Sequence, residues 1–212
     1  MPRPTTPDIL AALPDFLIAG TAILTWVDPT VLGVEKVGYF VLLMLLEFIV
    51  VHSAAFMGSV AFGKAPRMGR VGAILGLGLF YTLFVGAFAL GFHKTWQLWA
   101  FWTLVLNRLA GVLLGQGGDD GAQAVVRAGW AASVVFYLLA TFLTLFIPLP
   151  RLGVTPAVVA AQHFTSSGAW IEQPWRVLAM AAVYYTLQGV STLKAHGWAN
   201  RGARGSTPVA TT

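Results

Sequence analysis

The chain has no cysteine among its 212 residues. Disulfide bonds, thiolate metal sites, cysteine-ligated iron–sulfur clusters and cysteine nucleophiles are therefore excluded. Charge is also scarce, because only 10% of the residues are Asp, Glu, Lys or Arg. A soluble domain carries about 25% charged residues, so this chain has too few charges to cover a surface that faces water. The composition predicts an integral membrane protein.

Long apolar segments are what the chain has instead, with 57% hydrophobic residues and a mean hydropathy of +0.75. A transmembrane helix needs about 20 apolar residues to cross about 30 Å of hydrocarbon. We therefore expect an all-α, single-domain bundle of about six transmembrane helices within residues 1–198, followed by a disordered cytoplasmic tail over residues 199–212. The predicted spans are residues 9–27, 37–62, 71–92, 96–115, 129–147 and 175–193.

Residues 151–174 form the one substantial loop between predicted spans. Within it, Thr155 followed by Pro156 is typical of a helix cap with proline at the first helical position. The apolar run over residues 157–161 is too short to cross a bilayer. The sequence therefore predicts a short interfacial or re-entrant helix in this loop.

The distribution of Lys and Arg predicts the orientation, because cytoplasmic loops carry an excess of both. Eight basic residues fall on one side of the predicted bundle and four on the other, which places both termini in the cytoplasm; an even number of spans agrees. The eight are Arg3, Lys64, Arg67, Arg70, Arg127, Lys194, Arg201 and Arg204, and the four are Lys36, Lys94, Arg151 and Arg176.

The same bias accounts for the net charge of +5, so we expect no nucleic-acid partner. The frequent Ala, Gly, Leu and Arg suggest a GC-rich bacterium. We therefore expect a multi-pass protein of the bacterial cytoplasmic (inner) membrane.

Glu47 and Arg108 are two charged residues within apolar segments whose composition otherwise indicates membrane spans. An ionised side chain at the bilayer centre costs about 3 kcal/mol on insertion scales, so such residues usually have a partner or a function. By helical rise, Glu47 lies about 15 Å and Arg108 about 18 Å below the outer ends of their spans. At this similar depth, we expect an ion pair between them.

Other polar residues fall close to the same level. His52 lies five residues after Glu47, which turns it about 140° away on a helix. His52 therefore needs another neighbour, and Asp15 of the first span is the acidic candidate. Together we call these residues the buried polar layer: Glu47, Arg108, His52, Asp15, Asn107 and Gln188. Tyr81, Thr82, Tyr137 and Thr141 bracket the same region.

Two interpretations of the layer stay open. The polar groups either hold the bundle together through hydrogen bonds and salt bridges, or line a path for protons, ions or a polar solute. The first corresponds to a non-catalytic accessory subunit of a larger membrane complex. The second corresponds to a small transporter or channel.

A third hypothesis is a membrane enzyme with a haem or metal site near His93 and His163. No HExxH or GxSxG motif supports it, so the sequence favours a non-enzyme, and we predict no cofactor. The expected partners are the lipid bilayer and either other membrane subunits or a second copy of the chain, none of them linked by disulfides.

Overall fold

A computed structural model describes residues 6–114, 120–164 and 167–194, and within these ranges every regular element is a helix. The expected all-α class is therefore confirmed for the described residues. The predicted tail over residues 199–212 lies outside them. The helices are α1 (Thr6–Val27), α2 (Lys36–Ala61), α3 (Arg67–Gly91), α4 (Trp96–Leu113), α5 (Asp120–Phe146), α6 (Pro156–Ala160), α7 (Ala169–Glu172) and α8 (Pro174–Leu193).

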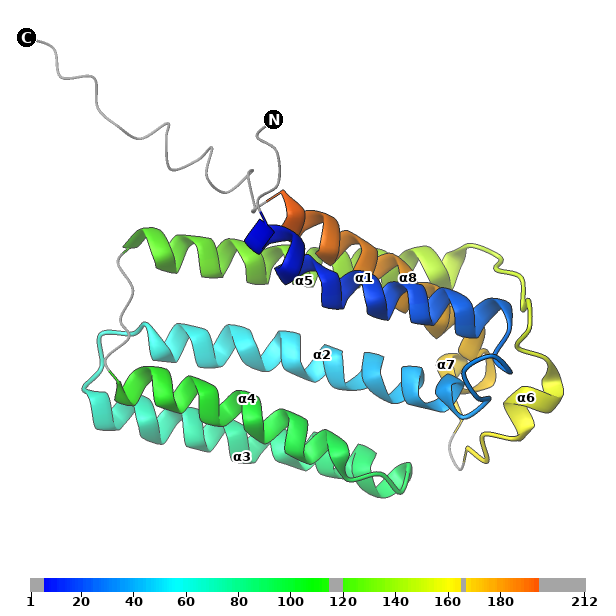
Figure 1. Ribbon diagram of the computed structural model, residues 1–212. Coiled ribbons are helices and arrows are strands. Elements are labelled where there is room, and N and C mark those ends of the chain that lie inside the picture. Colours follow the sequence, from blue (N-terminus) through cyan, green and yellow to red (C-terminus); the bar gives the residue numbers. More distant parts are fainter. Residues whose placement is uncertain (1–5, 115–119, 165–166, 195–212) are drawn as a thin grey trace, which may run out of the picture.

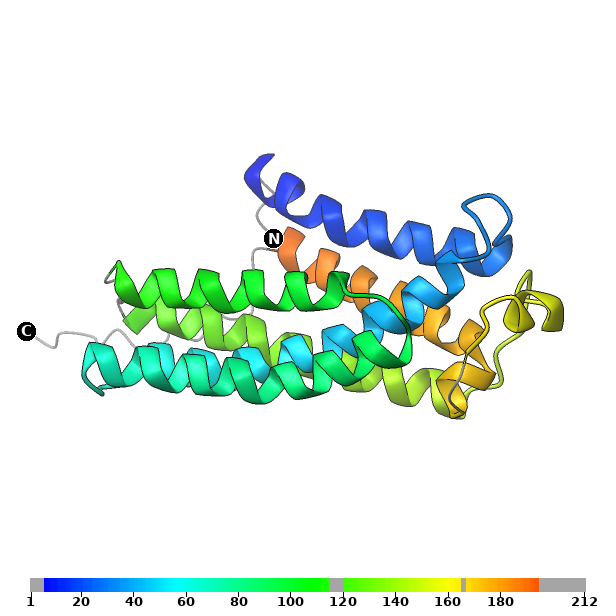
Figure 2. The ribbon, with the colours of Figure 1, turned by 90° about the horizontal axis from the view of Figure 1, so that it is seen from below.

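The six long helices lie alongside one another and alternate in direction along the chain (Figure 1). The first residues of α1 and the last of α8 lie at one end of the bundle, and the short helices α6 and α7 lie at the other. Turned by 90°, the bundle shows α2 crossing it obliquely (Figure 2). Helix α2 is the link between two groups, because it contacts α8 and α5 on one side and α3 and α4 on the other.

Helix α8 is the centre of the first group. It packs against α1, α2, α5 and α7, and Tyr184, Leu178 and Met180 are among its fully buried side chains. Small residues let α1 approach closely: a Cβ on Gly189 would lie 2.8 Å from the ring of Phe16. Close approach at small residues is a common way for helices to pack in membranes.

A second core lies between α2, α3 and α4. Its buried members include Ile74, Val85, Phe101 and Val105. Gly78 of α3 faces Val105 of α4, and a Cβ added to that glycine would lie 3.1 Å from the valine side chain. The two antiparallel helices α3 and α4 therefore pack as a pair on one side of α2.

Four helices are long and apolar enough to cross a membrane, namely α1, α2, α3 and the part of α5 from Arg127 to Phe146. Large apolar side chains point away from the bundle, such as Leu83 at 71%, Leu90 at 78% and Phe146 at 79% exposure. Water would not tolerate this much exposed hydrocarbon, so the surface suits lipid. The other two predicted spans, α4 and α8, fall outside this set, since α4 carries Arg108 and α8 carries Arg176 and several further polar residues.

Helix boundaries follow the predictions, with one clear departure. The expected short helix in the 151–174 loop is α6, where the hydroxyl of Thr155 accepts a hydrogen bond from the backbone N–H of Val158 at 3.4 Å. Helix α5, however, begins at Asp120, whereas the sequence predicted residue 129. The apolar part of α5, Arg127–Phe146, agrees with the predicted span. What the sequence reasoning missed is the helical stretch before it, whose polar composition was read as loop although its alanines favour helix.

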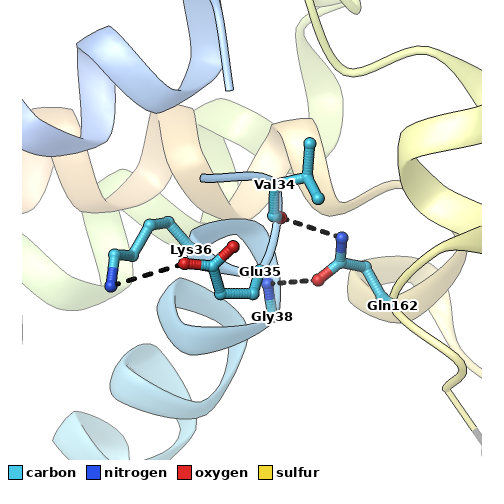
Figure 3. A network of polar contacts seen from close by, with 5 residues as sticks. All are labelled: Val34, Glu35, Lys36, Gly38 and Gln162. Carbon is cyan, nitrogen blue, oxygen red and sulfur yellow. Dashed lines mark hydrogen bonds and ion pairs between the residues drawn. The ribbon is translucent and has the colours of Figure 1, made fainter. Parts of the chain in front are cut away.

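Gln162 fastens the end of α6 to the start of α2 (Figure 3). Its side-chain oxygen accepts from the N–H of Gly38 at 3.0 Å, and its amide nitrogen donates to the carbonyl of Val34 at 2.9 Å. Beside it, Lys36 Nζ lies 3.8 Å from Glu35 Oε1, both on exposed side chains. This polar clasp lies at the end of the bundle opposite the first residues of α1.

Candidate functional site

Glu47 lies in the middle of α2, where two tyrosines of α8 meet its carboxylate. The hydroxyl of Tyr184 donates to Oε1 at 2.5 Å, and that of Tyr185 lies 3.5 Å from Oε2, which is a long hydrogen bond. Both tyrosines are buried, Tyr184 completely. A carboxylate within an apolar helix is therefore held by neutral donors of one neighbouring helix.

A chain of hydrogen bonds continues from Tyr184 to α5. The amide nitrogen of Gln188 donates to the hydroxyl of Tyr184 at 3.2 Å and to the hydroxyl oxygen of Ser133 at 2.7 Å. Ser133 in turn donates to the carbonyl of Gly129 at 3.1 Å. We call this set the Glu47 network: Glu47, Tyr184, Tyr185, Gln188 and Ser133. It joins α2, α8 and α5.

Aromatic packing fixes the phenols of the network. The ring of Tyr137 meets that of Tyr184 edge-on at 5.6 Å between centroids, and the Tyr184 and Tyr185 rings are 4.9 Å apart. The hydroxyl of Tyr137 donates to the carbonyl of Met44, one turn before Glu47, at 2.9 Å. Because these rings cannot turn independently in a packed core, the hydroxyls are pre-positioned around the carboxylate.

Asp15 lies on the α1 side of this network. Its carboxyl is close enough to interact electrostatically with Glu47 and with Tyr185. The neighbouring Phe16 packs on Gly189, one turn after Tyr185, which brings this part of α1 against α8. The sequence had suggested His52 as the partner of Asp15, and that pairing is not formed although both residues are described.

The predicted ion pair between Glu47 and Arg108 is also absent, although both residues are in the described part of the chain. Arg108 is half-buried and Asn107 exposed on α4. The depth estimate says nothing about the direction in which a side chain leaves its helix. Glu47 contacts α8, while α4 packs on α2 and α3. Arg108 lies about 8 Å from the last residue of α4, so its long side chain can extend to the bilayer interface.

His52 lies on another face of α2. Its Nδ1 atom is 2.8 Å from the carbonyl of Phe48, and because a carbonyl only accepts, Nδ1 carries the proton. The ring also packs on Phe48, with centroids 4.1 Å apart. His52 borders a cavity of about 820 Å³ between α2 and α5, with Arg127, Trp130 and Val134 on the opposite wall. We call it the α2–α5 cavity.

Of the predicted layer, the structure thus joins Glu47 to Gln188 through Tyr184 and places Asp15 within electrostatic reach of Glu47. His52 faces the α2–α5 cavity, and Asn107 and Arg108 lie apart. The sequence reasoning missed Tyr184, Tyr185 and Ser133. One available signal was spacing, since Tyr184 precedes Gln188 by one helical turn and so shares its face.

The weak metal candidates His93 and His163 are both exposed and both have positive φ, 52° and 50°. Their neighbours Phe92 and Phe164 pack edge-on with centroids 5.9 Å apart, so the two loops do meet. Within the described ranges, however, no three His, Asp or Glu side chains are grouped closely enough to hold a metal ion.

Comparison of the chain with protein-family models, with curated proteins and with solved structures finds no match in any of the three.

Proposed function

We propose that the protein is a small transporter or channel of the bacterial inner membrane, in which the Glu47 network binds the transported or coupling ion. The observation that carries this is a carboxylate in the middle of an apolar helix with only neutral donors bonded to it. Stability alone does not call for such a group, because apolar replacements of buried charges are often neutral or stabilising.

The proton is the ion that suits this site. The polar groups at Glu47 are two phenols, whereas Mg²⁺ or Ca²⁺ needs about six or more oxygen ligands. Hydroxyl and amide groups then continue to Ser133. Asp15 supplies a second carboxylate nearby, and a proton taken up by either group removes one of two like charges.

A polar stripe on α8 supports a route to Glu47. Tyr184, Gln188 and Ser191 recur at the helical spacing of four and three residues, so they share one face. The Ser191 hydroxyl is buried and finds no hydrogen-bond partner among the residues that the structure describes. Buried polar groups without a protein partner are ordinary sites for bound water, and Ser191 lies toward the end of α8.

Ion flux in proteoliposomes tests this proposal. With a pH-sensitive dye inside the vesicles and an imposed ion gradient, we expect the wild type to move protons and Glu47→Gln to abolish the movement, because the amide cannot take up a proton. Tyr184→Phe is expected to slow it. The exposed Glu35, on the other hand, allows a matched control in Glu35→Gln, which is expected to behave as the wild type.

Equal flux in Glu47→Gln and the wild type would remove the main support of the proposal. So would the absence of any protein-dependent flux under gradients of protons, sodium, potassium and chloride in turn.

An accessory subunit is the second candidate, and α4 favours it. Asn107 is exposed on this helix beside the half-buried Arg108, and polar side chains that face lipid promote association between helices. If this function is correct, a second membrane protein co-purifies at fixed stoichiometry, and Asn107→Leu weakens its retention while leaving the bundle folded.

A six-span topology with both termini in the cytoplasm belongs to the same proposal. The alternating direction of the six long helices supports it (Figure 1). So do the lengths of α4 and α8, which have 18 and 20 residues and therefore span about 27 and 30 Å.

A further inference from the structure

The α2–α5 cavity is separate from the Glu47 network. None of the network residues lines the cavity, and Trp130, which does line it, donates from its indole N–H to the carbonyl of Val51 at 2.8 Å. The cavity measures about 820 Å³, within the range of about 300–1,000 Å³ usual for small-molecule sites. It extends along the last third of α2, from His52 to Phe62, and along Arg127 to Val134 of α5. By helical rise its length along α2 is about 15 Å.

The walls of the cavity are apolar, while its end near the α2–α3 loop is basic. Ala54, Phe56 and Val134 supply hydrocarbon along its length. Arg127, about two turns into α5, lines it, and α2 ends and α5 begins at the same end of the bundle (Figure 1). Two residues after Phe62, the α2–α3 loop adds the exposed Lys64, and α3 begins with the exposed Arg67. The α2–α5 cavity, apolar along its length and basic at one end, is complementary to a molecule with an apolar chain and an anionic head.

We propose that the α2–α5 cavity binds an anionic phospholipid, with one acyl chain along its apolar walls and the phosphate beside Arg127. Clustered Lys and Arg at the end of a membrane helix attract anionic headgroups, at roughly 1 kcal/mol for each basic residue. The hydrocarbon walls suit the chain. The ring of His52, which packs on Phe48, lines the opposite end of the cavity. This binding goes beyond the transport proposal and does not depend on it.

Brominated lipids test the proposal, because bromine on an acyl chain quenches the fluorescence of a tryptophan that it touches, and Trp130 lines the cavity. The full chain is reconstituted in phosphatidylcholine vesicles that contain a small fraction of brominated phosphatidylglycerol or, in parallel, brominated phosphatidylcholine. We expect the wild type to be quenched more strongly by the anionic lipid at equal mole fraction.

Two glycine variants make a matched pair. A Cβ on Gly58, which lines the cavity, meets nothing within 4 Å, and the same is true of Gly76 on α3, which does not line it. Gly58→Leu fills the cavity and is expected to lose the excess quenching by the anionic lipid, whereas Gly76→Leu keeps it. Arg127→Gln is expected to lower the preference for the anionic lipid about fivefold, as the loss of one basic contact implies.

Equal quenching of the wild type by the two lipids overturns the proposal, as does an identical excess in the two leucine variants. Both variants replace a helical glycine with a better helix former, and circular dichroism establishes that they fold. If Gly58→Leu does not fold, Ala131→Leu fills the cavity from the α5 wall and carries the same expectation. The quenching is also expected to persist in Glu47→Gln, which separates lipid binding from ion transport.

Discussion

The chemistry of Glu47 depends on which donors surround it. An arginine would bring a full positive charge and fix the carboxylate in its ionised form. The phenols of Tyr184 and Tyr185 donate hydrogen bonds without adding charge, so they leave the carboxyl able to take up or release a proton. The difference between the expected arginine partner and the observed tyrosines is therefore the difference between a structural pair and a site that can change state.

Double-mutant cycles separate these two arrangements. We expect Glu47→Gln and Arg108→Gln to change the free energy of unfolding additively, within about 0.5 kcal/mol, because the residues make no contact. Glu47→Gln and Tyr184→Phe are expected to couple by about 0.5–3 kcal/mol, because the first weakens the acceptor and the second removes the donor of a shared hydrogen bond. Unfolding in mixed micelles measures both cycles. Strong coupling between Glu47 and Arg108 would contradict this expectation and support the ion pair that the sequence predicted.

The depth of polar residues was accessible from the sequence, and their directions were not. Helical rise placed Glu47 and Gln188 near one level, and the structure joins them through Tyr184. Direction depends on how each helix is rotated against its neighbours. Only packing fixes that rotation. Arg108 was therefore expected to pair with Glu47, whereas in the structure the carboxyl of Glu47 bonds to the tyrosines of α8.

Among the elements, α8 has surroundings that tightly restrict the size of its side chains. Gly189 lets Phe16 of α1 come within a distance that no Cβ tolerates. The same approach brings α1, with Asp15, beside Tyr185. A small residue at this position is thus a condition for the geometry of the candidate site, and not only for stability.

Substitution of two glycines tests this packing. In Gly189→Ala the new methyl group meets the Phe16 ring, whereas a Cβ on Gly20 of α1 meets nothing within 4 Å. Both variants gain the same helix propensity. We therefore expect Gly189→Ala to be less stable than Gly20→Ala by about 1–3 kcal/mol, the usual cost of overpacking. Thermal unfolding in detergent compares them, and equal stabilities would mean that the ring moves aside freely.

The elements themselves were largely predictable, because apolar length and proline or glycine signals determine them locally. The cap at Thr155 and the short helix after it are examples. The early start of α5 shows the limit of this reasoning, since a polar helix turn and a polar loop have similar compositions.

For the whole molecule, the question is how many helices cross the bilayer. Four satisfy the requirement of apolar length, and α4 and α8 carry more polar residues. In the fold, however, α8 lies among α1, α2 and α5. A helix surrounded by others can span with polar groups inward, where lipid does not meet them. The hydropathy of a single helix does not show whether neighbouring helices keep its polar groups away from lipid.

Cysteine labelling distinguishes six spans from four, and the chain, which has no cysteine of its own, suits it. Single variants Lys64→Cys, Lys94→Cys and Arg151→Cys each place a thiol at an exposed loop position. With six spans, a membrane-impermeant reagent outside the cell labels positions 94 and 151 but not 64.

If only α1, α2, α3 and α5 cross, position 151 lies on the same side as position 64 and is labelled only after the membrane is opened. Ser53→Cys, buried on α2, is the control that neither condition labels.

The central place of α8 also bears on how the protein is made. Helices α1 to α5 leave the ribosome before it, yet α1 makes its main packing contact with α8 and only slight contact with α2. During synthesis, α1 is made before the helix that it packs against. Asp15 precedes the first residue of α8 by more than 150 residues, so α8 does not cover this side chain until much later. The Glu47 network, which needs Tyr184, Tyr185 and Gln188 of α8, therefore cannot assemble before α8 has been made.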